Sequence, residues 1–312
     1  MTLVACSPMQ IGIALEGIRP VAELVQLAAR VEALGFDSLW TPDHVVFSQP
    51  ICDPFQVLAA CAGATTRIRL GTCVLLLPLR HPTHVAKQAS SLDWLCGGRL
   101  TLGIGIGGEF PGEFAACQVP VAERGARTNE AIPILRALWR GEDPPAEGRF
   151  FPVPRTKLAP RPAQAGGPPI WIGGRSDAAL RRAAWLGDGY LGYFLDAKGI
   201  RSRMARIREL RSEAPDAHRR EEPITTALMA FARVDDDGER ARARIRQRLG
   251  VMYGKETEAA GERFCVAGTR AECRDRLAEL AAAGVDHLVF SPTNDEDGGG
   301  TEPQLERLAA LR

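Results

Sequence analysis

The sequence lacks a large excess of charge of either sign, and it lacks a long uninterrupted hydrophobic run. Its 39 Lys and Arg residues nearly balance its 38 Asp and Glu residues, which gives a formal net charge of +1. Nucleic acid or an anionic membrane is therefore not expected as a partner. No apolar stretch approaches the roughly 18 residues that a membrane span needs. The N-terminus has no basic stretch followed by an apolar run, so we expect no signal peptide and a cytoplasmic location.

Several motifs of common site types are also missing. The eight cysteines form no C-x-x-C pair, and a disulfide framework is unusual in a chain of 312 residues, so we expect reduced thiols. His81 and His84 have H-x-x-H spacing, but Pro82 lies between them and no third ligand is evident, so no metal site is expected. The sequence contains neither a Walker A motif nor a G-x-S-x-G elbow.

What the sequence does contain is a regular alternation of short apolar runs with helical patterns. The runs predict buried strands at 10–15, 36–40, 68–77, 100–106, 169–174, 187–192, 224–234 and 285–291. Helical patterns lie between them. Buried parallel strands joined by right-handed crossovers form either a closed barrel or an open doubly wound sheet. Eight units without a break in composition favour a (β/α)8 TIM barrel, formed by residues 1–312 as a single domain.

Three stretches interrupt the alternation and are expected to be insertions, at about 107–120, 142–168 and 251–264. The second holds much of the chain's proline. Long ordered loops in compact domains are usually functional. We therefore expect 142–168 to cross the mouth of the barrel and to shape a pocket together with 107–120.

The run from Gly103 to Gly108 matches G-x-G-x-x-G after a predicted strand. A dinucleotide fold would need a helix to begin there, so that its N-terminus meets the pyrophosphate. The chain instead continues with prolines at 111 and 120, which argues against that fold. We interpret Gly105 and Gly107 as a strand end that packs closely under a flat ligand, or simply as part of a tight barrel strand.

A second glycine pair has a more suitable context. Gly173, Gly174, Arg175 and Ser176 lie between a predicted strand and a predicted helix. Free backbone N–H groups at a helix N-terminus, a hydroxyl group and a guanidinium group together suit a phosphate. The same residues would also explain an ordinary turn in which Ser176 caps the helix.

Candidate catalytic residues follow the second and fourth strands. Asp43 and His44 come directly after the second strand, where catalytic groups of a barrel lie. Histidine titrates near neutral pH, so His44 could move a proton during hydride transfer. A turn after Pro42 with a solvent-facing histidine is the alternative. Glu109, just past the fourth strand, is the other candidate acid or base.

Several motifs in order resemble the luciferase-like monooxygenase superfamily. They are GFDSLWTPDH, RIRLGTCVLLLPLRHP, GGRLTLGIGIGGE, RGARTNE with LRALWRGE, PPIWIGGRSDAALRRAAWLGDGY and AGVDHLVF. The similarity covers about residues 10–195 and 265–291, and residues 200–264 resemble no family that we can place. The resemblance implies a (β/α)8 barrel that binds either FMN or the deazaflavin coenzyme F420.

The resemblance also implies roles for individual residues. Residues matching Asp43 and His44 contact the ring in the deazaflavin branch, and the histidine is implicated in catalysis. A non-prolyl cis peptide behind the ring falls on Cys73–Val74, and the phosphate-binding stretch falls on 173–176. A carboxylate of the deazaflavin-dependent sugar-phosphate dehydrogenases aligns at Gly108, one residue from Glu109. The role of Glu109 is therefore open.

These observations leave three hypotheses about function. The favoured one is a coenzyme F420-dependent oxidoreductase that transfers hydride to or from a small-molecule substrate, because of the TPDH and GTCV motifs. The alternatives are an FMN-dependent monooxygenase that reacts with oxygen, and a non-catalytic barrel that has lost its cofactor. The resemblance implies a homodimer, while the identity of the substrate does not follow from the sequence.

Overall fold

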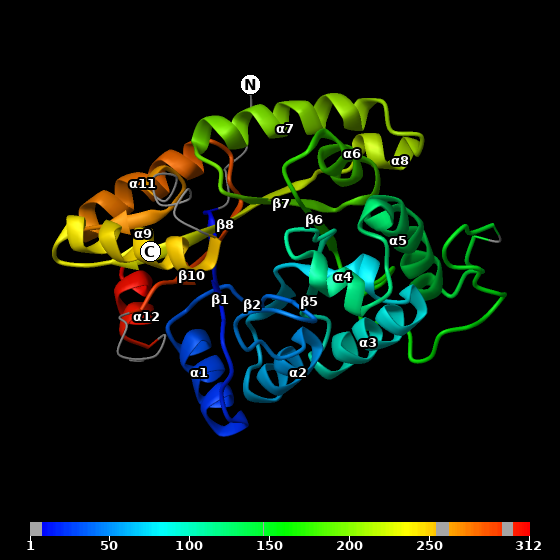
Figure 1. Ribbon diagram of the computed structural model, residues 1–312, viewed down its shortest axis with the longest axis horizontal. Helices are drawn as coiled ribbons and strands as arrows, with labels where there is room; N and C mark the ends of the chain where they lie inside the picture. The colour runs from blue at the N-terminus through cyan, green and yellow to red at the C-terminus, as the bar shows by residue number, and fades with distance from the viewer. Residues whose placement is uncertain (1–7, 146, 254–261, 295–301) are drawn as a thin grey trace.

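Parallel strands close into a barrel that helices surround (Figure 1). The computed structural model describes residues 8–145, 147–253, 262–294 and 302–312. Around the ring, the strands are β1 (Gln10–Ala14), β2 (Ser38–Thr41), β3 (Arg69–Thr72) with β4 (Leu75–Leu76), β5 (Leu100–Gly105), β6 (Ile170–Gly173), β7 (Gly189–Tyr193), β8 (Thr225–Val234) and β10 (His287–Pro292). Strand β10 pairs with both β1 and β8, which closes the ring. The predicted (β/α)8 barrel is confirmed.

Two details differ from the predicted strands. The third predicted strand is split into β3 and β4, which both pair with β5, and the break lies at the Cys73–Val74 peptide. A short additional strand, β9 (Val266–Gly268), pairs with the end of β8. The ring therefore has eight strand positions, and β9 extends the sheet beside one of them.

The helices follow the predicted alternation, and several begin with the residues that favour a helix start. The helices are α1 (Val21–Ala33), α2 (Pro54–Ala64), α3 (Pro82–Leu95), α4 (Pro111–Ala116), α5 (Arg124–Arg140), α6 (Asp177–Leu186), α7 (Ala197–Ser212), α8 (Ala217–Glu221), α9 (Gly238–Tyr253), α11 (Arg270–Ala282) and α12 (Glu302–Ala309), with 3-10 turns at Leu77–Leu79 and Val121–Glu123. Proline opens α2, α3 and α4. Thr269 and Glu272 form a capping box on α11. No helix in the described part of the chain is long and apolar enough to cross a membrane.

The proline-rich segment 142–168 does not cross the mouth of the barrel, so that prediction is wrong. It follows α5 and packs near the amino end of β5, where Gln164 hydrogen-bonds to the Asp93 carboxylate and to the backbone oxygen of Leu100. The segment 107–120 does lie at the carboxyl end, and it contains α4. Of 251–264, residues 251–253 end α9, whereas 254–261 lie outside the described residues.

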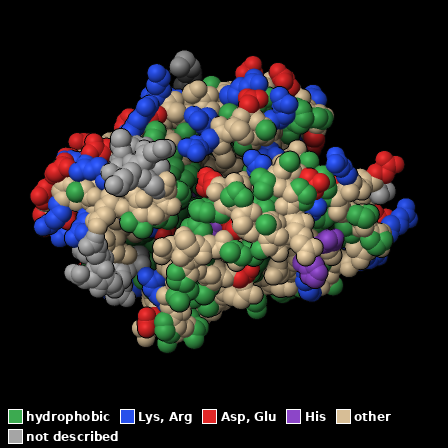
Figure 2. Space-filling model, in the orientation of Figure 1, with side chains coloured by type: hydrophobic (Ala, Val, Ile, Leu, Met, Phe, Trp, Pro, Cys, Tyr) green, Lys and Arg blue, Asp and Glu red, His purple; other side chains and the backbone are tan. Residues whose placement is uncertain are grey.

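Acidic and basic side chains are interspersed over the described surface of the face in Figure 2, in agreement with the small net charge.

The barrel interior below its mouth holds a network of buried polar side chains. His287 is 1% exposed, and its Nε2 lies 2.6 Å from Ser38 Oγ, while its Nδ1 lies 3.0 Å from Gln10 Oε1. Trp40 donates to the same Ser38 Oγ and stacks on Trp171. Burial lowers the pKa of His287 to about 3, so the ring is neutral.

This buried histidine predicts a loss of stability in acid. The pKa of His287 in the folded chain is about 3, whereas an unfolded histidine has a pKa near 6.5. Below about pH 6.5 His287 binds a proton in the unfolded chain but not in the folded chain, so stability falls as the pH falls until the folded pKa is reached. Between about pH 7 and pH 4.5 this one group should lower the free energy of unfolding by about 2 to 3 kcal/mol. Urea unfolding at each pH measures the slope.

His287→Gln removes the titrating group and should flatten this part of the stability profile. His218→Gln is the matched control, because it also removes one histidine, but one whose side chain is 77% exposed. An identical slope in the wild-type chain and His287→Gln would show that other groups cause the acid sensitivity.

Candidate active site

A cavity of about 840 Å³ opens at the carboxyl ends of the barrel strands. This volume lies in the range of small-molecule and cofactor sites. The cavity brings together all of the residues that the sequence nominated: Asp43, His44, Cys73, Val74, Gly105, Gly107, Glu109, Gly173, Gly174, Arg175 and Ser176. The loop after β5 contributes to its wall, whereas none of the described residues of 142–168 does. The expectation that the two segments shape one pocket is therefore wrong: 142–168 packs outside the barrel against α3 and α5, where Phe151 contacts His81 and Arg127.

His44 is held by a buried carboxylate that the sequence analysis did not identify. Glu113 on α4 is 1% exposed, and its Oε1 lies 2.9 Å from His44 Nδ1. Its Oε2 accepts a hydrogen bond of 2.8 Å from the backbone N–H of Val45. A carboxylate only accepts hydrogen bonds, so Nδ1 of a neutral His44 carries the proton. Nε2 is then the unprotonated nitrogen, and it can accept a proton.

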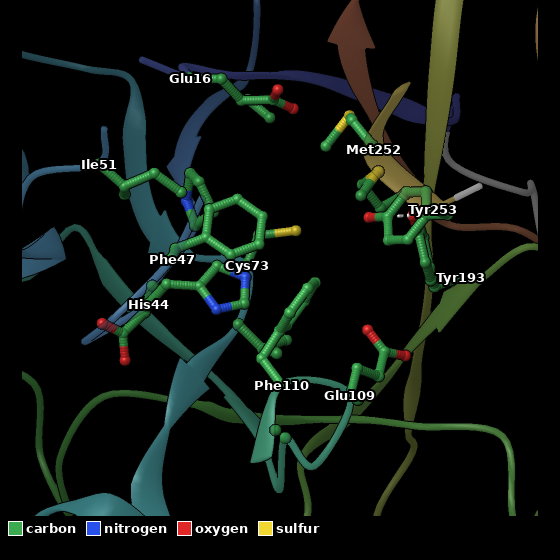
Figure 3. Close-up of a pocket in the computed structure, with 18 of the residues that line it drawn as sticks. Glu16, His44, Phe47, Ile51, Cys73, Glu109, Phe110, Tyr193, Met252 and Tyr253 are labelled. Carbon is green, nitrogen blue, oxygen red and sulfur yellow. Dashed lines mark hydrogen bonds between the residues drawn. The ribbon is translucent and has the colours of Figure 1, made fainter. Parts of the chain in front are cut away.

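Two aromatic rings fix the orientation of the imidazole. Phe47 stacks on His44 with ring centroids 4.0 Å apart and planes 5° from parallel, and Phe110 meets His44 edge-on at 5.3 Å. The three rings form one side of the cavity (Figure 3). The imidazole therefore has a fixed position at the cavity wall and a fixed tautomer.

Asp43 has a different environment from the one expected of a proton-transfer group. Its side chain is fully buried, both oxygens accept hydrogen bonds from Arg80 at 2.6 and 2.8 Å, and one also accepts from the backbone N–H of Leu76. Burial raises the pKa of Asp43, and Arg80 opposes this effect. Because its oxygens are engaged, the geometry favours a positioning role, in which Asp43 ties the end of β2 to β4.

The peptide between Cys73 and Val74 is cis, where the family resemblance placed a non-prolyl cis bond. Val74 fits there because its neighbours lack side chains: a Cβ on Gly105 would lie 2.3 Å from Val74, and one on Gly173 would lie 3.0 Å from it. Burial raises the pKa of the Cys73 thiol to about 12, so the sulfur that points into the cavity in Figure 3 is a neutral thiol.

The turn at residues 173–176, the candidate phosphate site, has the predicted backbone arrangement. Ser176 caps α6 by accepting from the N–H of Ala179, and Gly174 has a φ of 130°, which favours glycine. Tyr190 donates a hydrogen bond of 2.9 Å to the Gly174 oxygen and so fixes the turn. Arg124, from the start of α5, lines the same cavity, and its buried Nε has no hydrogen-bond partner among the described residues. Cationic groups and free N–H groups at one place suit an anionic group.

The opposite side of the cavity carries two tyrosines. Tyr193 at the end of β7 and Tyr253 at the end of α9 hydrogen-bond to each other through their hydroxyl oxygens, 2.6 Å apart. Glu109 is exposed and points into the cavity from the same side as the tyrosines (Figure 3). Burial raises the pKa of both phenols, that of Tyr253 to about 12. The role of Glu109 stays a prediction.

Sequence reasoning missed Glu113, Arg80, Arg124 and the two tyrosines. Apart from Arg124, each acts through a partner that is distant along the chain: 69 residues separate His44 from Glu113, and 60 separate Tyr193 from Tyr253. The only local signal was Pro111, which opens the short helix that carries Glu113. A search for a proline-opened helix within the loop after the fourth strand could have identified this carboxylate.

Comparisons with known proteins agree with this arrangement. The family model described as luciferase-like monooxygenase matches residues 1–262. The F420-dependent glucose-6-phosphate dehydrogenase of Nakamurella multipartita is 29% identical over 305 residues, which cover 88% of each chain. The oxygenase component of flavin-dependent trigonelline monooxygenase from Acinetobacter baylyi is 34% identical over 155 residues, 49% of this chain and 43% of that protein. Monooxygenase RslO1 from Streptomyces bottropensis has the same fold, with a TM-score of 0.83, 24% identity and coverage of 97% and 98% of the two chains.

Proposed function

The chain belongs to the luciferase-like monooxygenase family, and from that starting point we propose that it is a coenzyme F420-dependent oxidoreductase. In this proposal a hydride passes between the deazaflavin and a small organic substrate. The observation that carries it is His44, whose position and tautomer are fixed by Glu113 and whose Nε2 is left as a proton acceptor at the cavity wall. A hydride transfer to or from a carbon bonded to oxygen or nitrogen needs such a group, because a proton moves as well.

The residues of the cavity fit a deazaflavin or a flavin. The turn at 173–176 and the N-terminus of α6 would hold a phosphate group, together with Arg175 and Arg124. The cis peptide and the adjoining glycines leave a surface against which a flat ring can lie. When bound, the deazaflavin would supply a carbon that accepts or donates a hydride. The chain's residues would orient the ring, exclude water and move the proton.

Two considerations support F420 over FMN. The F420-dependent relative aligns over 88% of both chains, whereas the flavin-dependent relative aligns over less than half of either. The site also offers a proton acceptor with a defined tautomer, which a hydride transfer uses directly. An FMN-dependent monooxygenase is the second candidate, supported by the family to which the chain belongs.

Titrating the purified chain with each cofactor tests the proposal. The fluorescence of F420 should be quenched or shifted as it binds saturably to the chain. FMN should bind at least 10-fold more weakly, a difference of roughly 1.4 kcal/mol in binding free energy. The reverse order of affinity would make the protein an FMN enzyme. Binding of neither cofactor would favour the non-catalytic barrel. Arg175→Ala is the companion variant, since losing a phosphate contact should weaken binding of whichever cofactor the chain takes.

A further inference from the structure

The wall of the cavity opposite His44 carries hydrogen-bonding groups that the proposed chemistry does not use. Tyr193 and Tyr253 both line the cavity, and their hydroxyl oxygens are 2.6 Å apart. In Figure 3 the two tyrosines and Met252 face His44, Phe47 and Cys73 across the open space. A group that binds here therefore lies away from the part of the substrate that exchanges a proton with His44.

The two hydroxyl groups carry two protons between them, and their mutual hydrogen bond uses only one. The other proton remains available to an acceptor in the cavity, whichever tyrosine donates within the pair. Burial raises the pKa of both phenols, so the pair stays protonated through the neutral range. The pair thus presents a neutral hydrogen-bond donor.

The surroundings hold the pair in place. Tyr193 and Tyr253 pack with Phe194 and Phe231, and the Phe194 ring meets the Tyr253 ring edge-on at 5.7 Å. These rings come from β7 and the residue that follows it, from β8 and from α9, so the helix end that carries Tyr253 is packed onto the barrel. A donor with a fixed position gives more specificity than a mobile one, because less conformational entropy is lost when the ligand binds.

The charges in this half of the cavity are unsuited to an anionic substrate. Arg248 forms an ion pair with Glu16 and donates to the backbone oxygen of Pro292, and Arg244 is also engaged in an interaction. Glu109 adds a carboxylate near the two tyrosines. The carboxylates of Glu16 and Glu109 balance the charges of the two arginines, so this half of the cavity offers an anion no net positive charge. The remaining lining of this half combines the apolar side chains of Val251, Met252 and Phe231 with the uncharged polar side chains of Gln247, Thr293 and Asn294.

We propose that Tyr193 and Tyr253 together donate a hydrogen bond to a substrate oxygen remote from the reacting carbon, and that the substrate is an uncharged, mainly apolar compound carrying such an oxygen. The pair is then a determinant of specificity. The position of this oxygen away from the reacting carbon rests on the proposed function, whereas the hydrogen bond from the two tyrosines does not. A phosphorylated substrate is excluded by this proposal.

Three probes of similar shape test the proposal: acetophenone, which has a carbonyl oxygen; α-methylstyrene, which has a methylene group in its place; and benzoate, which is anionic. Each is titrated calorimetrically into the purified full chain, with and without F420. Acetophenone should bind at least roughly 5-fold more tightly than α-methylstyrene, the gain expected of one hydrogen bond, and more tightly than benzoate. The infrared carbonyl band of bound acetophenone should lie at lower wavenumber than that of acetophenone in an apolar solvent.

The double variant Tyr193→Phe with Tyr253→Phe should reduce the preference for acetophenone over α-methylstyrene to about 1-fold and return the carbonyl band toward its apolar position. Met252→Leu is the matched control: it changes the same wall without removing a hydroxyl, so the preference should persist. No preference in the wild-type chain, tighter binding of benzoate, or a preference that survives in the double variant would each overturn the proposal. Failure to bind F420 would instead count against the proposed function, because the titration without cofactor still reports on the tyrosines.

Discussion

Replacing His44 by alanine should lower turnover by on the order of 10²-fold or more while F420 affinity stays nearly unchanged. The proton acceptor Nε2 is lost, whereas the groups that would hold the cofactor, the cis peptide and the turn at 173–176, are not touched. Single-turnover kinetics with preloaded F420 would separate the two quantities. Full turnover in His44→Ala would remove His44 from the mechanism.

Glu113→Gln tests why His44 is effective. The carboxylate of Glu113 accepts two hydrogen bonds, from His44 Nδ1 and from the N–H of Val45. An amide has one oxygen and one NH2 group, so it can keep only one of these bonds without a change elsewhere. If the NH2 group faces Nδ1, the histidine proton moves to Nε2 and the acceptor is lost. We expect a smaller fall in turnover than for His44→Ala. His84→Ala, on α3 outside the cavity, is the control and should turn over normally.

The fold was predictable because it depends on patterns that are local in sequence. Apolar runs and capping residues predicted eight barrel strands, and the structure has strands at all eight positions. The residues nominated at strand ends share one cavity for the same reason, since the carboxyl ends of parallel strands meet at one face. The position of the cis peptide, by contrast, came from the family resemblance and not from any local pattern.

What the sequence did not reveal concerns contacts between distant segments. The segment 142–168 follows a helix, and in this fold a chain leaving a helix is at the amino ends of the strands, so the segment begins there as a consequence of topology, and Gln164 is again near that end. Its proline content suggested a functional loop, but proline also suits a rigid connection. Asp43 was expected to move a proton because of its position after β2. What the sequence did not reveal is that Arg80, 37 residues away, would engage its carboxylate.

Replacing Arg80 by methionine should destabilise the fold by about 3 to 5 kcal/mol, because the buried Asp43 carboxylate then loses its charged partner. Only the hydrogen bond from the Leu76 N–H would remain among its present contacts. Urea unfolding near neutral pH measures the loss. The double variant Asp43→Asn with Arg80→Met is the control: it removes both charges, and we expect it to be clearly more stable than Arg80→Met alone.

The pH dependence of Arg80→Met distinguishes an unpaired charge from a simple loss of packing. Burial raises the pKa of Asp43, and Arg80 is the largest influence that opposes it. Without Arg80 the pKa of Asp43 in the folded chain should rise further, so the stability deficit of the variant relative to the wild-type chain should shrink as the pH falls from about 8 to 5. A defect caused by lost packing of the arginine stem would be the same at both values, and it would persist in the double variant. A pH-independent loss would therefore show that Arg80 acts through its packing, and that Asp43 positions the end of β2 without depending on its charge.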